Sequence, residues 1–130
     1  MIRLIATDLD GTLLTWSATT PPRSISPRTH AALEAAREAG VLVLPVSGRQ
    51  PFSIAHGVRG TYLAEGPVIG ANGAIGVHLG SGQFFFERLV DADAKFALFA
   101  GLRTLFPDVG CVSVRDGGNA FLAARTGVCS

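Results

Sequence analysis

The sequence predicts an α/β protein in which a Rossmann-like parallel sheet is followed by part of a smaller α+β region. Three observations carry this prediction. Short apolar runs alternate with helical segments, polar clusters directly follow the apolar runs, and hairpin patterns begin only after residue 73. The chain has 130 residues, which suits one domain or a small domain with a piece of another.

The first strand is expected over residues 2–7, IRLIAT, a short apolar run with β-branched members. Such a run is typical of a strand buried on both faces of a parallel sheet. Residues 15–25 are rich in Thr, Ser and Pro, so we expect a loop there.

A helix is predicted over residues 26–40, followed by a second buried strand over 41–46. Ser26 is a suitable N-cap, Pro27 suits the first helical turn, and Gly40 suits a C-terminal stop. A strand, a helix and a strand form a βαβ unit, whose crossover is right-handed and whose strands are parallel.

The rest of the chain continues the alternation and then changes character. The expected elements are a weaker helix at 50–58, a third strand at 67–71, a hairpin from 74–79 and 83–90, a helix at 92–106 capped by Asp91, and a second hairpin from 111–115 and 120–125. We therefore divide the chain into an α/β core over 1–79 and an α+β part over 80–130. The aromatic face of the last helix, with Phe96, Phe99 and Phe106, is expected to form the core of that second part.

Composition excludes several classes of protein. The chain has 11 basic and 10 acidic residues, and no basic cluster that would bind nucleic acid. No apolar run is long enough to span a bilayer, and the N-terminus does not read as a signal peptide. We expect a cytoplasmic protein that binds neither nucleic acid nor membrane.

Two aspartates, Asp8 and Asp10, follow the first predicted strand. Ligands of open α/β sheets bind beyond the carboxyl ends of the strands, and two carboxylates placed there repel each other unless a cation or proton intervenes. Gly11 permits a turn, and Thr12 with the turn amides offers donors to an anion. Hard oxygen ligands suit Mg²⁺, so the pattern favours phosphoryl transfer with an aspartate nucleophile.

A second polar cluster, Ser47-Gly48-Arg49, follows the second predicted strand. The Ser47 hydroxyl and the Gly48 amide are suited to hold phosphate oxygens at the start of the next helix. Arg49 either assists them or is simply solvated. Asn72, with the glycine after it, is by default a tight turn.

The segments DLDGTLL and SGR together resemble the haloacid dehalogenase superfamily of phosphohydrolases, most closely its Cof-like sugar-phosphate phosphatase branch. The resemblance covers essentially the whole chain, and GANGAI is similar to that branch's passage from its core to an inserted α/β cap. It implies that Asp8 is the nucleophile that forms an aspartyl-phosphate and binds Mg²⁺. It implies that Asp10 is the general acid and base, with its carbonyl on the metal, and that Thr12 steadies Asp10 and the turn.

The resemblance also implies a phosphate site, but the sequence departs from the family's pattern in its later motifs. Ser47, the Gly48 amide and Arg49 would hold the phosphoryl group, and Asn72 would lie where substrate and core meet. The family's later lysine and acidic pair are absent, because the only lysine, Lys95, belongs to the predicted cap helix.

We therefore expect the amino-terminal portion of such an enzyme, with an incomplete core and a partial cap. Two functions stay open: a Mg²⁺-dependent phosphatase of small phosphorylated metabolites, and a non-catalytic remnant or interaction module. Unpaired strand edges and the FFF run at 84–86 predict a homo-oligomer, or completion by a carboxy-terminal half.

Overall fold

The computed structural model describes residues 1–17 and 20–124. Their mixture of helices and strands confirms the predicted α/β class. The chain packs as two compact units, Met1–Glu87 and Arg88–Ser130. The division into a core over 1–79 and a cap over 80–130 stays a prediction about domains.

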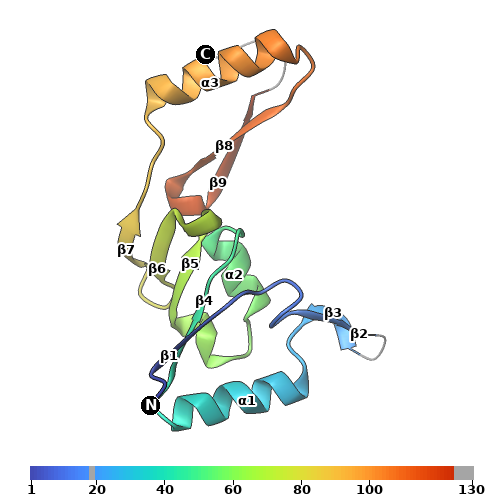
Figure 1. Cartoon of the computed structure of the whole chain (residues 1–130), viewed down its shortest axis with the longest axis vertical. Helices are drawn as coiled ribbons and strands as arrows, with labels where there is room; N and C mark the ends of the chain where they lie inside the picture. The colour runs from blue at the N-terminus through green and yellow to red at the C-terminus, as the bar shows by residue number, and fades with distance from the viewer. Residues whose placement is uncertain (18–19, 125–130) are drawn as a thin grey trace. The chain divides into compact units, whose positions relative to one another are not determined.

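The first unit contains three neighbouring parallel strands (Figure 1). Strand β1, Leu4–Thr7, pairs in parallel with β4, Leu42–Pro45. A parallel bridge between Val46 and Ile69 joins the end of β4 to β5, Pro67–Gly70. The predicted strands at 2–7, 41–46 and 67–71 are thus neighbours in space, in the order that two successive βαβ units require.

Helix α1, Pro27–Glu38, connects β1 to β4 and begins and ends where the sequence predicts. The Ser26 hydroxyl accepts a hydrogen bond from the Thr29 N–H at 3.1 Å, which caps the first turn. Gly40 lies in the left-handed region, with φ of +70°, and ends the helix. Leu33 is the buried residue of this helix, and its side chain joins the core.

Helix α2, Pro51–Gly57, and a 3₁₀ turn, Tyr62–Glu65, connect β4 to β5. This agrees with the weaker helix predicted at 50–58. The helices and strands of the first unit bury one cluster of aliphatic side chains. Its buried members are Leu9, Leu13, Leu14, Leu33, Val43, Ile54, Val58, Leu63, Val68, Ile75 and Val77.

The first predicted hairpin is confirmed, and it extends the sheet of the first unit. Strand β6, Ile75–His78, pairs antiparallel with β5 on one side and with β7, Gln83–Glu87, on the other. Gly76 and Phe86 are opposite each other in the β6–β7 register, and the Phe86 ring covers the Gly76 Cα. This contact gives Phe86 a half-buried position, whereas Phe85 is 54% exposed.

The loop predicted over 15–25 was wrong. The structure has a short antiparallel hairpin there, formed by β2, Thr15–Ser17, and β3, Thr20–Ser24. Thr and Pro both favour extended backbone, and a two-stranded ribbon needs no alternation of apolar residues. Composition therefore could not distinguish it from a loop.

The burial expected for the first strand on both faces was also wrong. Leu4 is 50% exposed and Ile5 is 42% exposed. Strand β4 is the only neighbour of β1 among the described strands, so one edge of β1 is open. The apolar pattern correctly predicted a strand, but burial depends on neighbours that the pattern does not specify.

The second unit holds helix α3, Ala92–Leu105, and an antiparallel hairpin of β8, Cys111–Arg115, and β9, Ala120–Ala124. The helix and the hairpin were both predicted. Asp91 caps α3, since its Oδ1 accepts from the N–H groups of the second and third helical residues at 3.0 and 3.1 Å. No residue of α3 is buried, so the aromatic core expected there is absent from the described part of this unit. No described helix has the length and apolar character needed to cross a bilayer.

Candidate functional site

The carboxyl ends of the three parallel strands are tied together by main-chain hydrogen bonds. The Val46 N–H donates to the Thr7 carbonyl at 2.8 Å, and the Ser47 N–H donates to the Ile69 carbonyl at 2.9 Å. Asp8 directly follows Thr7, so the first predicted site residue and Ser47 lie at adjacent strand ends. The topology thus groups the polar clusters that the sequence placed after separate apolar runs.

The turn after β1 is fixed by two buried leucines. Leu9 and Leu14 are 0% and 1% exposed, and the N–H groups of Thr12 and Leu14 both donate to the Leu9 carbonyl, at 3.2 and 2.7 Å. Gly11 has φ of +86°, a conformation that other residues adopt at a cost. With Leu9 turned into the core, Asp8 and Asp10 on either side of it are exposed.

Ser47, Gly48 and Asn72 lie in direct contact. The Asn72 N–H donates to the Ser47 carbonyl at 3.3 Å. A Cβ placed on Gly48 would lie 2.7 Å from Asn72 Oδ1, so only glycine lets the Asn72 side chain come so close. The predicted phosphate-site residues from the second and third strands therefore form one cluster, in which Ser47 is buried, at 7% exposed.

The backbone of this cluster is strained on the β5 side. Ala71 and Asn72 have φ of 53° and 54°, and Gly73 has φ of 90°. Left-handed residues other than glycine cost about 1–3 kcal/mol each and occur preferentially at functional sites. The Ala71 N–H donates to the Arg49 carbonyl at 2.8 Å, and this bond helps hold the strained segment in place.

Arg49 joins the two clusters through its side chain. Its Nε donates to Asp10 Oδ2 at 2.7 Å, and its second terminal nitrogen, Nη2, donates to Asp10 Oδ1 at 2.5 Å. The Arg49 N–H donates to the Ser47 hydroxyl at 3.2 Å. Of the two readings of Arg49, simple solvation was wrong, since the side chain is 19% exposed and bound to a carboxylate.

The oxygen atoms at this site are ligands of the type that Mg²⁺ prefers, but there are too few of them to complete a site. Mg²⁺ prefers about six oxygen ligands in octahedral geometry. Asp8 and Asp10 would supply oxygens, but the Asp10 carboxylate is held by Arg49. In residues 1–17 and 20–124, no three His, Cys, Asp or Glu side chains are grouped closely enough to hold a metal ion. These residues fit one side of a magnesium site.

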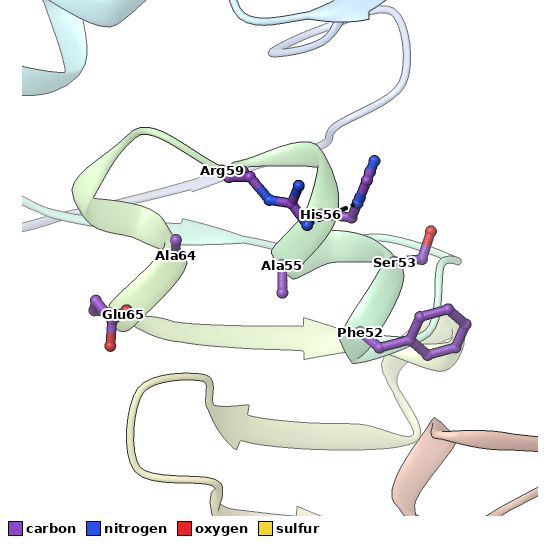
Figure 2. Close-up of a pocket in the computed structure, with 7 residues that line it drawn as sticks. All are labelled: Phe52, Ser53, Ala55, His56, Arg59, Ala64 and Glu65. Carbon is purple, nitrogen blue, oxygen red and sulfur yellow. Dashed lines mark hydrogen bonds between the residues drawn. The ribbon is translucent and has the colours of Figure 1, made fainter.

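A separate shallow pocket lies between α2 and the following 3₁₀ turn (Figure 2). The Arg59 guanidinium donates to His56 Nδ1 at 3.1 Å, so this nitrogen of His56 accepts. The lining contains none of the residues predicted for the site, and the sequence gives no signal for this pocket. The pocket is lined by Phe52, Ser53, Ala55, His56, Arg59, Ala64 and Glu65.

Comparison with known proteins identifies the family. Residues 5–115 match the family of haloacid dehalogenase-like hydrolases. A haloacid dehalogenase-like hydrolase of Bacillus subtilis is 27% identical, with a TM-score of 0.64 over 80% of this chain. A phosphatase of this superfamily from Bacteroides thetaiotaomicron is 24% identical, with a TM-score of 0.73 over 96% of this chain. The subclass IIB sugar phosphatase BT4131 is 20% identical, with a TM-score of 0.66 over 93%.

The chain spans less than half of these three solved structures, namely 34%, 42% and 43% of their lengths. No curated protein matches it. The likeness at 24% and 20% identity concerns the fold, and the fold agrees with the sugar-phosphatase branch that the sequence resembles. The family match covers most of the chain and includes the Asp8 turn, Ser47 and Asn72. The chain therefore belongs to the haloacid dehalogenase-like hydrolase family.

Proposed function

We propose that the chain carries the first catalytic half of a Mg²⁺-dependent phosphatase of small phosphorylated metabolites. The observation that carries the proposal is the meeting of the Asp8–Asp10 turn with Ser47 and Asn72 at three adjacent strand ends. The sugar phosphatase among the similar structures supports a phosphorylated sugar as substrate. A cytoplasmic location belongs to the same proposal.

Each residue has a role in the proposed reaction. An Asp8 carboxylate oxygen attacks phosphorus, and the bond from phosphorus to the leaving oxygen breaks. Asp10 gives its proton to that oxygen, and then takes a proton from the water that cleaves the aspartyl-phosphate. Ser47 and the Gly48 amide hold the phosphoryl oxygens, and Thr12 and Asn72 lie at the edge of this phosphate site.

Magnesium would be held by the Asp8 carboxylate and the Asp10 carbonyl, where it would offset negative charge on the phosphoryl group. The remaining ligands would come from water, from the substrate or from residues outside this chain. Asp8 would face an anionic substrate, so a fixed positive charge is needed as well. Completion by a carboxy-terminal half, or a second copy of the chain, would supply what is missing.

A second function is favoured by a specific observation. The only lysine of the sequence, Lys95, belongs to the second compact unit, and the one guanidinium that we place at the strand ends is bound to Asp10. A chain arranged in this way would keep the fold of the family but would not catalyse phosphate hydrolysis. It would then act as a non-catalytic interaction module.

Hydrolysis of a panel of sugar phosphates, with and without Mg²⁺, tests the first function. We expect slow, Mg²⁺-dependent release of inorganic phosphate that Asp8→Asn abolishes. Asp108→Asn, at an exposed aspartate between α3 and β8, is the control and should leave the rate unchanged. Losing one preorganised charge typically lowers the rate by about 10²–10³, so the chain alone should be slow. A phosphorylated Asp8 peptide, trapped by acid quench and detected by mass spectrometry, would identify the nucleophile. Equal rates in the wild type and Asp8→Asn would instead support the non-catalytic module.

A further inference from the structure

Arg49 touches all three strand ends of the candidate site. Its guanidinium binds Asp10 after β1, its N–H donates to the Ser47 hydroxyl after β4, and its carbonyl accepts from the Ala71 N–H after β5. The backbone of Arg49 is therefore held by the proposed phosphate site, while its side chain reaches the proposed acid–base residue.

The contact between Arg49 and Asp10 has the geometry of a phosphate contact. Two nitrogens of the guanidinium face the two carboxylate oxygens, at 2.7 and 2.5 Å. A phosphate group presents two oxygens in the same way, and arginine binds either group bidentately. The Asp10 carboxylate thus occupies the donors that a phosphoryl group would use.

We infer that Arg49 exchanges Asp10 for the phosphoryl group of the substrate when the substrate binds. In the free chain Arg49 holds Asp10. A phosphoryl group on Ser47 and Gly48 takes over the guanidinium. The released Asp10 carboxylate then takes up a proton from solvent, which it can give to the leaving oxygen. Arg49 therefore selects anionic substrates and makes the acid–base residue available only when one is bound. This inference rests on the proposed function.

Two further facts permit the exchange. The Asp10 side chain is 51% exposed, so a dissolved anion can reach the pair. A doubly charged phosphate carries more negative charge than the carboxylate and offers the same two-oxygen geometry, so it can compete for the guanidinium. The end of the guanidinium also lies beside a glycine, because a Cβ on Gly57 would be 3.4 Å from Arg49 Nη1. The missing side chain leaves room beside the guanidinium.

Arginine Nε–H signals in ¹H–¹⁵N NMR of the 130-residue chain test the exchange without requiring catalysis. The Arg49 signal is assigned by its absence in Arg49→Lys, and inorganic phosphate is the probe, with sodium chloride at equal ionic strength as control. We expect the Arg49 Nε–H and the Gly48 amide to shift with the same phosphate dissociation constant. Asp10→Asn should bind phosphate about two- to fivefold more tightly than the matched variant Asp8→Asn, because both remove one charge and only Asp10→Asn frees Arg49.

Three results would overturn the inference, and they can be told apart. Phosphate that shifts the Ser47 and Gly48 amides while the Arg49 signal stays fixed would keep the phosphate site and exclude the exchange. Equal phosphate affinity in Asp10→Asn and Asp8→Asn would exclude competition by Asp10. No shift of either group would remove the phosphate site, and the proposed function would fail with it.

Discussion

Leu4 lies opposite Leu42 in the parallel register of β1 and β4, and both side chains are exposed, by 50% and 43%. In-register neighbours on parallel strands point to the same face of a sheet. Ile2, just before β1, is 70% exposed and continues the apolar surface. Parallel sheets are normally covered on both faces, so this edge and face of the first unit are suited to bind another polypeptide.

We therefore predict that the chain self-associates through β1. Replacing Leu4 by lysine should weaken association at least about tenfold, because a buried leucine contributes about 1.5–3 kcal/mol and a charge there would be desolvated. Sedimentation velocity over a wide concentration range measures the change. Leu89→Lys is the matched control, since Leu89 is 78% exposed and lies outside the strands and helices. A wild-type chain that stays monomeric throughout would refute this prediction.

Gly76→Ala should destabilise the first unit by about 1–3 kcal/mol. A Cβ at this position would lie 2.5 Å from Phe86 Cε1 and 2.9 Å from its Cδ1, so the ring would have to leave its place. Urea unfolding gives the difference in free energy. The β6–β7 packing described above would be wrong if Gly76→Ala unfolded at the wild-type urea concentration.

Gly101→Ala should stabilise the chain, in contrast to Gly76→Ala. Gly101 lies inside α3, and no heavy atom of a neighbouring described residue is within 4 Å of a Cβ built on it. Alanine should therefore raise the stability of α3 by about 0.5–1 kcal/mol, through helix propensity alone. Circular dichroism during thermal unfolding measures this gain, and a loss of helix content in the variant would contradict the open surroundings of Gly101.

Ser26→Ala should cost about 1 kcal/mol of stability, because the first turn of α1 would lose the acceptor for its Thr29 N–H. Ser26→Asp should restore most of the loss, since aspartate is an equally good N-cap. Chemical unfolding of the three chains gives both values. If Ser26→Asp were as unstable as Ser26→Ala, the role of the hydroxyl would be something other than capping.

Tyr62 should make the chain less stable in alkali. Burial raises the pKa of this phenol from 10.0, and the nearby Glu34 carboxylate raises it further, whereas Arg37 lowers it. A raised pKa means that folding favours the neutral phenol. The stability contributed in this way is fully present below pH 10.0 and is lost as pH rises through the folded pKa.

Tyr62→Phe isolates this effect. The Tyr62 hydroxyl is buried without a hydrogen-bond partner among the described residues, so its removal should be neutral or stabilise the chain by about 1 kcal/mol near neutral pH. The advantage of the variant should grow above pH 10.0. Tyr62 is the only tyrosine, so tyrosinate absorbance reports its ionisation directly. A titration midpoint below the ordinary value would contradict the burial.

Much of the fold follows from local signals in the sequence. The Ser26 cap, the Gly40 stop and the Asp91 cap are interactions within one turn of chain, and they predicted α1 and α3 correctly. The hairpin of β6 and β7 also follows from local turn residues. Its antiparallel pairing with β5 does not, because β5 also belongs to the set of parallel strands.

Long-range contacts explain what could not be predicted. The order of residues placed Asp8, Ser47 and Asn72 after strands, and parallel pairing was enough to expect them at one edge of a sheet. The ion pair of Arg49 with Asp10 spans 39 positions and depends on side-chain length and packing. No pattern of residue types specifies such a contact, so the role of Arg49 stayed open until the strand ends were in place.

The single bridge between β4 and β5 has a consequence for local opening of the sheet. The amides of Ser47, Ala71 and Asn72 all donate to carbonyls of the facing segment, close to that bridge. Breaking any one of these hydrogen bonds would expose the others to solvent. Hydrogen–deuterium exchange at the three amides should therefore follow one common opening, and the candidate site should be protected as a unit.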